Sequence, residues 1–215
     1  AFNVAADGTN LDYQWESDIS GSWQDLSDGG DISGSQTDQL IISNAANADE
    51  ANYRVVVSGD CGPDQTSANV SLTVNDNTQI TTQPSNTIVC EGNDATFDIA
   101  ADGTNLDYQW QSNVSGSWQD LSDGGDISGA QTDQLTIANT DDTDEADYRC
   151  LVSGVCGNQT SDAVSLTVNP NTQITSQPSN QTVCQGENAA FNVAADGTNL
   201  DYQWESDISG SWQDL

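Results

Sequence analysis

The chain repeats itself, and this constrains its fold more than any other feature. One run of eleven residues, Ala-Ala-Asp-Gly-Thr-Asn-Leu-Asp-Tyr-Gln-Trp, occurs three times, at residues 5–15, 100–110 and 194–204. The copies begin at Ala5, Ala100 and Ala194, so each step is about 95 residues. Self-similarity at a fixed period indicates one domain repeated in tandem.

The repeat also predicts the domain boundaries. Residues 1–26 are identical to residues 190–215, so the chain holds two units followed by the start of a third. We expect an incomplete first domain over residues 1–76 that lacks its N-terminal strands, a complete domain over 77–170, and the start of a third domain over 171–215. We expect the parent protein to be a longer array of the same kind.

Short segments in which apolar and polar residues alternate indicate β-strands. In the second unit they include Tyr108 with Trp110 and Leu135 with Ile137, and clusters of Gly, Asn, Asp and Ser separate the segments. No segment keeps the 3.6-residue period of a helix. Closely spaced strands in a domain of roughly 95 residues indicate an antiparallel sandwich. The predicted fold class is therefore all-β, with one antiparallel β-sandwich per repeat.

The charge of the chain excludes several classes of partner. The sequence has 34 acidic residues, two arginines, no lysine and no histidine, for a formal net charge of -32. Nucleic acids and anionic membrane surfaces are bound by clustered cations, so we expect neither as a partner. No apolar run approaches the ~20 residues that span a bilayer, so we expect no membrane insertion in this segment.

Two motifs in each unit resemble the immunoglobulin superfamily. Residues 108–110 read Tyr-Gln-Trp, and residues 144–150 read Asp-x-Ala-x-Tyr-x-Cys; the first unit repeats the pattern at 13–15 and 49–55, with Val in place of the Cys. In that family a buried Trp on strand C packs behind a Tyr-x-Cys on strand F, whose Tyr forms a tyrosine corner. The resemblance implies tandem immunoglobulin-like (I-set-like) sandwiches, with these structural core residues: Trp15, Tyr53, Trp110 and Tyr148. The chain is similar above all to tandem repeats of large Bacteroidota-type cell-surface filament and adhesin proteins.

The sequence departs from that family at one cysteine. The strand-B partner of Cys150 is expected at residue 99, which is Ile, and the first unit has Val4 at the same place. The usual disulfide between strands B and F therefore cannot form. We expect Cys150 to be a small buried apolar residue, as Val55 is in the first unit.

The other cysteines are the disulfide candidates, and they fall into two kinds. Cys90 and Cys184 follow the predicted strand A′, whereas Cys61 and Cys156 lie in the predicted hairpin between strands F and G. Regularly repeated cysteines indicate an oxidising, extracellular setting. Pairing within a unit is one alternative. The other is a clamp between units, because the resemblance places the two kinds at opposite ends of a sandwich, farther apart than the ~7 Å between Cα atoms that a disulfide allows.

Carboxylates are too numerous here to mark a catalytic pair, so we predict no enzyme and no catalytic residue. Calcium is the one candidate cofactor, since hard cations bind oxygen ligands in loops. The candidate ligands lie between strands B and C and in the first linker, at Asp102, Asn105, Asp107 and Asp76. None of these loops has EF-hand spacing.

Two tryptophans and the two arginines are candidate surface contacts. Alternation turns Trp118 outward, to the same face as Arg149, and Trp23 and Arg54 repeat the arrangement in the first unit. The functional alternative is a platform for sugar stacking or filament contact. We expect instead that the arginine covers the indole as a cation–π pair.

Together these features predict a structural repeat of an extracellular filament or giant surface adhesin. The array would form an extended acidic stalk at the cell surface, with neighbouring repeats or filament subunits as partners. The alternative function is a carbohydrate- or calcium-binding module of a secreted protein, with cell-surface glycans as partner.

Overall fold

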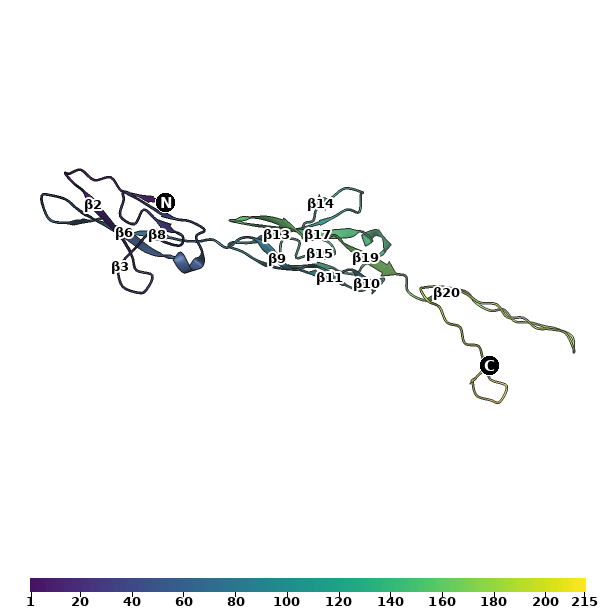
Figure 1. Ribbon diagram of the computed structural model, residues 1–215. Coiled ribbons are helices and arrows are strands. Elements are labelled where there is room, and N and C mark those ends of the chain that lie inside the picture. The colour runs from purple at the N-terminus through teal and green to yellow at the C-terminus, as the bar shows by residue number, and fades with distance from the viewer. The chain divides into compact units, whose positions relative to one another are not determined.

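The computed structural model describes residues 1–215 and confirms the all-β class (Figure 1). The chain divides into two compact units, Ala1–Asp76 and Asn77–Leu215. The only helical segments are two single turns of 3-10 helix, η1 (Asn47–Asp49) and η2 (Asp142–Asp144). No helix has the length and apolar character needed to cross a membrane.

Residues 77–169 form a complete sandwich. Its strands are β9 (Gln79–Thr82), β10 (Thr87–Cys90), β11 (Ala95–Asp98), β12 (Ala100–Asp102), β13 (Asp107–Ser112), β14 (Gln119–Asp120), β15 (Ile127–Ser128), β16 (Gln134–Ile137), β17 (Asp147–Gly154), β18 (Gly157–Thr160) and β19 (Val164–Asn169).

One layer has the strand order β10-β19-β17-β13-β14, with β18 also paired to β17. The other has the order β11-β16-β15, and β12 continues the line of β11 to pair with β9. All pairs are antiparallel except β10 with β19, which run parallel. The segment that begins the domain therefore contributes one strand to each layer, first β9 and then β10.

The core lies between the two layers, where every second side chain of each strand points inward. Trp110 and Leu135 are fully buried, and Phe97 stacks on Tyr148 with ring centroids 5.1 Å apart. Asp107 begins β13 after a turn in which Asn105 has φ of 53°, a left-handed conformation that Asn tolerates better than most residues. The repeated sequence thus encodes both a strand and the turn that enters it.

The first unit is the same sandwich without its first two strands. Its elements are β1 (Phe2–Asn3), β2 (Asp12–Ser17), β3 (Gln24–Asp25), β4 (Ile32–Ser33), β5 (Gln39–Ile42), β6 (Ala51–Ser58), β7 (Gln65–Thr66) and β8 (Val70–Leu72). The layers are β1-β5-β4 and β3-β2-β6-β7, with β8 paired to β6. Residues 1–76 contain no counterpart of β9 or β10, and their buried apolar core is smaller: Trp15, Leu40, Tyr53 and Val55.

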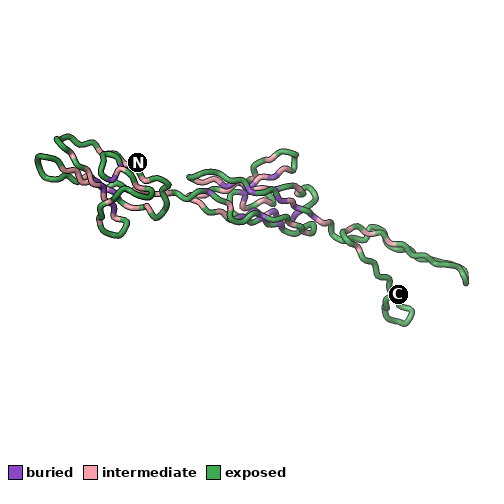
Figure 2. Tube along the Cα trace, in the orientation of Figure 1, coloured by how far each residue is buried: buried purple, intermediate pink, exposed green.

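Residues 171–215 begin a third repeat with β20 (Gln173–Ser176), β21 (Ala194–Asp196), β22 (Glu205–Ser206) and β23 (Gln213–Asp214). Only two short antiparallel pairs form, β20 with β21 and β22 with β23. Most of this segment is exposed (Figure 2). Its apolar side chains therefore lack the second layer that buries their counterparts in the complete domain.

Candidate functional site

The aromatic residues that carry the motif lie in the two cores. Trp110 is buried on β13, and its indole N–H donates a hydrogen bond of 3.0 Å to the carbonyl of Thr132. The hydroxyl of Tyr148, on β17, donates to the carbonyl of Asp144 at 2.7 Å. This is the tyrosine corner expected of the fold. Burial raises the pKa of Tyr148 far above its usual value, so the side chain stays neutral and structural.

The first unit repeats these contacts. Trp15 donates to the carbonyl of Thr37 at 2.9 Å, and the hydroxyl of Tyr53 donates to the carbonyl of Asp49 at 2.6 Å. The motif residues therefore build the fold, and a functional site has to be sought on the surface.

A tryptophan–arginine patch lies on the outer face of the β13 layer. The Arg149 guanidinium lies 4.2 Å from the centroid of the Trp118 ring, as a cation–π pair requires. Its Nε also donates to Oε1 of Gln111 at 2.8 Å. The arginine covers one face of the indole, and that face is not available to stack on a sugar ring.

The first unit holds the same patch with a charged partner. Arg54 lies 4.0 Å from the centroid of the Trp23 ring, and its Nε pairs with the Glu16 carboxylate at 2.5 Å. Sequence reasoning named the arginines and tryptophans but missed Glu16 and Gln111. The signal was present, because both residues follow the Trp of the repeated run directly and occupy the same position in their units.

The thiol of the buried cysteine is unreactive. Cys150 is fully buried on β17, and burial raises the pKa of its thiol to about 11. A thiol with so high a pKa stays protonated near neutral pH and is a poor nucleophile. Its place in the core is the one that Val55 takes in the first unit.

The four disulfide candidates are exposed and none is in a disulfide: Cys61, Cys90, Cys156 and Cys184. In the complete domain, Cys90 is the last residue of β10 and pairs with Asn169, where β19 ends. Cys156 lies in the β17–β18 hairpin and forms a bridge with Asn77, where the domain begins. Between these two ends the chain runs along the sandwich as β9 and then β10, whose eight strand residues at ~3.3 Å each span roughly 26 Å. That span is longer than the ~7 Å between Cα atoms that a disulfide allows, and Cys90 and Cys156 are not bonded to each other.

The calcium candidates do not gather into a site. Asp102 ends β12, Asp107 begins β13, and Asn105 lies in the turn between them. Asp76 accepts a hydrogen bond of 2.9 Å from the side-chain amide of Asn47. Across the chain, no three His, Cys, Asp or Glu side chains are placed to hold a metal ion.

Some carboxylates have perturbed pKa values, and their cause is structural. In each case a hydrogen bond to the carboxylate lowers its pKa. Asn52 donates to Asp18, Ser35 donates to Asp28, and Thr143 donates to Asp141. These bonds stabilise the charged form in turns and at the start of η2. A general acid needs the opposite shift.

Comparison with known proteins supports the fold reading. Residues 78–168 match the model of the Immunoglobulin I-set domain, and this match covers the complete sandwich. The chain thus has the fold of tandem immunoglobulin-like sandwiches, and its complete domain matches the I-set model. A fragment of titin, I67–I69, has a TM-score of 0.66 at 15% identity and is matched over 95% of this chain and 70% of that chain.

A second similar structure is the N-terminal eight immunoglobulin domains of Down Syndrome Cell Adhesion Molecule. Its TM-score is 0.60 at 20% identity, over 76% of this chain and 21% of that chain. At such identities the likeness concerns the fold alone.

Two curated relatives match parts of the chain. Endoglucanase C of Cellulomonas fimi is 32% identical over 120 residues, which are 55% of this chain and 10% of that protein. Muscle M-line assembly protein unc-89 of Caenorhabditis elegans is 29% identical over 175 residues, which are 77% of this chain and 2% of that protein. The chain therefore spans a small part of each relative. A Bacteroidota-type surface origin stays a prediction.

Proposed function

We propose that this chain is a structural segment of an extracellular filament or giant surface adhesin, where it forms part of an extended acidic stalk. One observation carries the proposal. The complete domain begins at Asn77, beside the β17–β18 hairpin, and ends at Asn169, beside the last residue of β10. The chain therefore enters at one end of the sandwich and leaves at the other, which is the connection that an extended stalk requires.

The charge of the domain suits an extended shaft. Residues 77–169 contain fifteen acidic residues and one arginine. The buried polar or charged residues of the whole chain are all Ser or Thr, so no carboxylate is buried. Over a sandwich roughly 40 Å long, this is about one net charge per 3 Å, against one per ~1.7 Å in duplex DNA. Such a surface repels its neighbours within about one Debye length, ~8 Å at physiological salt.

Salt tests the charge argument. Added NaCl should raise the melting temperature of the chain, because it screens the repulsion between like charges. Millimolar Ca²⁺ should raise it further as a divalent counterion, with no specific site required. A melting temperature that neither salt changes would contradict the role assigned to the charge.

The extracellular location has its own test. One similar structure consists of eight immunoglobulin domains of a cell adhesion molecule, as its name states. Exposed cysteines that recur in register favour the oxidising side of the membrane. Antibodies raised against residues 77–169 should label intact cells of the source organism. Labelling that requires permeabilised cells would place the array inside the cell and refute the proposal.

The exposed cysteines also suit a clamp between successive repeats. One lies at the foot of each domain and one at its head, so a disulfide could join each foot to the next head. Formation of the bond releases two protons and passes two electrons to an oxidant such as a small-molecule disulfide. Oxidation of the chain with glutathione disulfide followed by peptide mapping should yield no link between Cys90 and Cys156. Detection of that link would refute the clamp.

A carbohydrate-binding module is the second candidate, because one partial relative is named an endoglucanase. The patch that would serve it contains Trp118, half-buried under Arg149. Saturable binding to a polysaccharide, lost in Trp118→Ala and kept in Trp212→Ala, would favour this candidate over the stalk.

A further inference from the structure

We propose that two pairs of side chains, Asp18 with Asn52 in the first unit and Asn113 with Asp147 in the complete domain, direct each central strand to a partner within its own repeat. Each pair joins one carboxylate to one amide, and the two units carry the carboxylate and the amide in opposite order. The inference concerns how neighbouring repeats fold independently, and it does not depend on the extracellular role.

The central strands of the two units are nearly the same. β2 reads Asp-Tyr-Gln-Trp-Glu-Ser and β13 reads Asp-Tyr-Gln-Trp-Gln-Ser. β2 pairs with β6 in the same register in which β13 pairs with β17. Tandem domains can misassemble during folding when a strand of one domain pairs with a strand of the other. In such an exchanged fold, β2 would pair with β17 and β13 would pair with β6.

Most contacts of these strands would tolerate the exchange. Trp15 would lie opposite Cys150 instead of Val55, and both of these are small, fully buried side chains. Glu16 would lie opposite Arg149 in place of the arginine of its own unit, so an ion pair would still be possible. These contacts therefore do not distinguish the correct partner from the exchanged one.

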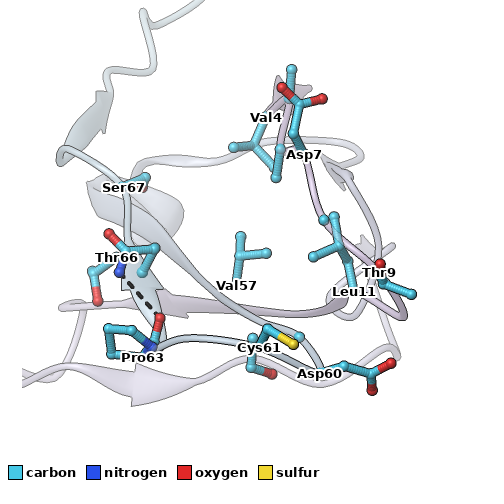
Figure 3. Close-up of a pocket in the computed structure, with 16 residues that line it drawn as sticks. Val4, Asp7, Thr9, Leu11, Val57, Asp60, Cys61, Pro63, Thr66 and Ser67 are labelled. Carbon is cyan, nitrogen blue, oxygen red and sulfur yellow. Dashed lines mark hydrogen bonds between the residues drawn. The ribbon is translucent and has the colours of Figure 1, made fainter.

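The segment before each of these strands is repeated as well. Residues 5–11 are identical to residues 100–106. In the first unit, Leu11 and Val57 of β6 line one hollow (Figure 3). In the complete domain, Leu106 and Val152 of β17 belong to the same core cluster. An exchange would again bring a leucine and a valine together, so this contact does not specify the partner either.

The first side-chain pair lies at the end of the β2–β6 ladder. Asp18 follows β2, and Asn52 is the second residue of β6. The backbone N–H of Asn52 donates to Oδ1 of Asp18 at 2.8 Å, and the side-chain amide of Asn52 donates to Oδ2 at 2.9 Å. Both carboxylate oxygens therefore accept a hydrogen bond from the same partner, and these bonds lower the pKa of Asp18.

The complete domain holds the same pair in reverse. Oδ1 of Asn113 accepts from the backbone N–H of Asp147 at 3.1 Å, and the Asn113 side-chain amide donates to Oδ2 of Asp147 at 3.5 Å. The backbone is unchanged, because the N–H of Asp18 donates to the carbonyl of Asn52 at 3.2 Å and the N–H of Asn113 donates to that of Asp147 at 3.1 Å. The carboxylate and the amide have changed places on one backbone frame.

An exchange of strands would mismatch these pairs. Asp18 would lie opposite Asp147, and two carboxylates would occupy the positions where a carboxylate now accepts from an amide at 2.9 or 3.5 Å. Like charges directly opposite each other on neighbouring strands destabilise the pairing. The other exchanged pair, Asn113 with Asn52, is uncharged. A reciprocal exchange therefore always creates one repulsive pair, whereas the native pairing creates none.

The order of the pair alternates along the chain. Asp18, Asn113 and Asp207 stand at the same place in successive repeats. Adjacent repeats are the most able to exchange strands, because the loop that an exchange must close between them is the shortest. An identical pair in every repeat would form the same hydrogen bonds but would not distinguish neighbours. Alternation supplies that distinction where exchange is easiest.

A reporter disulfide in the full chain measures the exchange. Asp12→Cys and Ser153→Cys place two thiols that lie directly opposite each other only when β2 pairs with β17, at a distance that a disulfide can bridge. The chain is unfolded and then refolded under reducing conditions, at a dilution that prevents exchange between molecules. After oxidation with glutathione disulfide, peptide mapping by mass spectrometry gives the yield of the link between positions 12 and 153.

Three chains that carry this reporter are compared. Asn113→Asp with Asp147→Asn gives the complete domain the order of the first unit, so both exchanged pairs match and the yield of the link should rise about 2- to 5-fold over that of the starting chain. Further addition of Asp18→Asn with Asn52→Asp reverses the first unit too. The units then differ again, and the yield should return to that of the starting chain. This third chain is the matched control, because it contains every substitution of the second.

The melting temperatures separate partner choice from simple stabilisation. Every pair in the three chains keeps one carboxylate and one amide, so calorimetry should show little change in either domain. Equal yields of the link in the three chains would overturn the proposal. A rise that persists in the third chain would overturn it as well, because the effect would then come from the substituted residues themselves and not from their match to the other unit.

Discussion

The buried tryptophan of the complete domain allows a sharp test of the fold. Trp110 is completely shielded from solvent, and the centroid of its ring lies 6.1 Å from that of Phe97. Trp110→Ala removes the largest fully buried side chain and leaves a cavity, which costs about 3–5 kcal/mol. A domain of this size is stabilised by only about 5–15 kcal/mol. The substitution should therefore remove a large part of its stability.

The assay is differential scanning calorimetry of the full chain. Each kcal/mol of lost stability lowers the melting temperature of a domain of this size by about 4 °C or more, so the melting temperature of the complete domain should fall by at least ~12 °C. Trp118→Ala is the control, because it removes the same type of side chain outside the core. Its expected cost in stability is ~1 kcal/mol, the contribution of an exposed cation–π pair. The first unit, with Trp15 intact, serves as internal reference. Equal effects of the two substitutions would refute the assignment of Trp110 to the core.

Three further predictions concern single groups. Asp141→Ala should lower the melting temperature at neutral pH, because folding lowers the pKa of this carboxyl below its ordinary 3.8. The difference in melting temperature from wild type should be present above pH 3.8 and should vanish as the pH falls through the lowered pKa. A double-mutant cycle on Arg54 and Glu16 should give a coupling of about 0.2–1 kcal/mol that falls with added salt, and a coupling independent of salt would contradict an ion pair. A thiol reagent should modify four cysteines quickly in the native chain and Cys150 only after unfolding, as mass spectrometry would show.

The sequence was sufficient to predict the sandwich, because its pattern is local. Alternation along β13 and β17 follows from which side chains face the other layer, and Tyr148 and Trp110 appear at the spacing of the family. The tyrosine corner and the cation–π pair over Trp118 both follow from the face on which each residue lies.

Strand pairing could not be predicted in the same way, because it depends on a partner distant in sequence. The tripeptide Ala-Ala-Asp forms a strand at 100–102 and 194–196 but not at 5–7. Its own sequence is identical in the three places, so the difference comes from the presence of β9 or β20.

The same dependence yields a last prediction about the complete domain. Ile80 packs from β9 onto the core, so Ile80→Asp should release that strand from β12. The loss of one buried isoleucine costs about 1.5–3 kcal/mol and should lower the melting temperature of the domain. A synthetic peptide of residues 171–182, which repeats most of the sequence of β9 and its flanking residues, should restore it, because binding to the folded state alone adds stability by mass action.

Thr81→Asp is the matched control, since Thr81 is exposed between two residues of the same strand and its side chain leaves the core contact intact. This variant should keep its own β9 in place and gain nothing from the peptide. Because β9 is joined covalently to its domain, its effective concentration is near millimolar. A free peptide at a lower concentration can take its place only when β9 itself is disabled. Rescue of Ile80→Asp without rescue of Thr81→Asp would show that the repeats accept a strand by sequence and register. Failure of the peptide to stabilise Ile80→Asp would show that β9 acts only as part of its own chain.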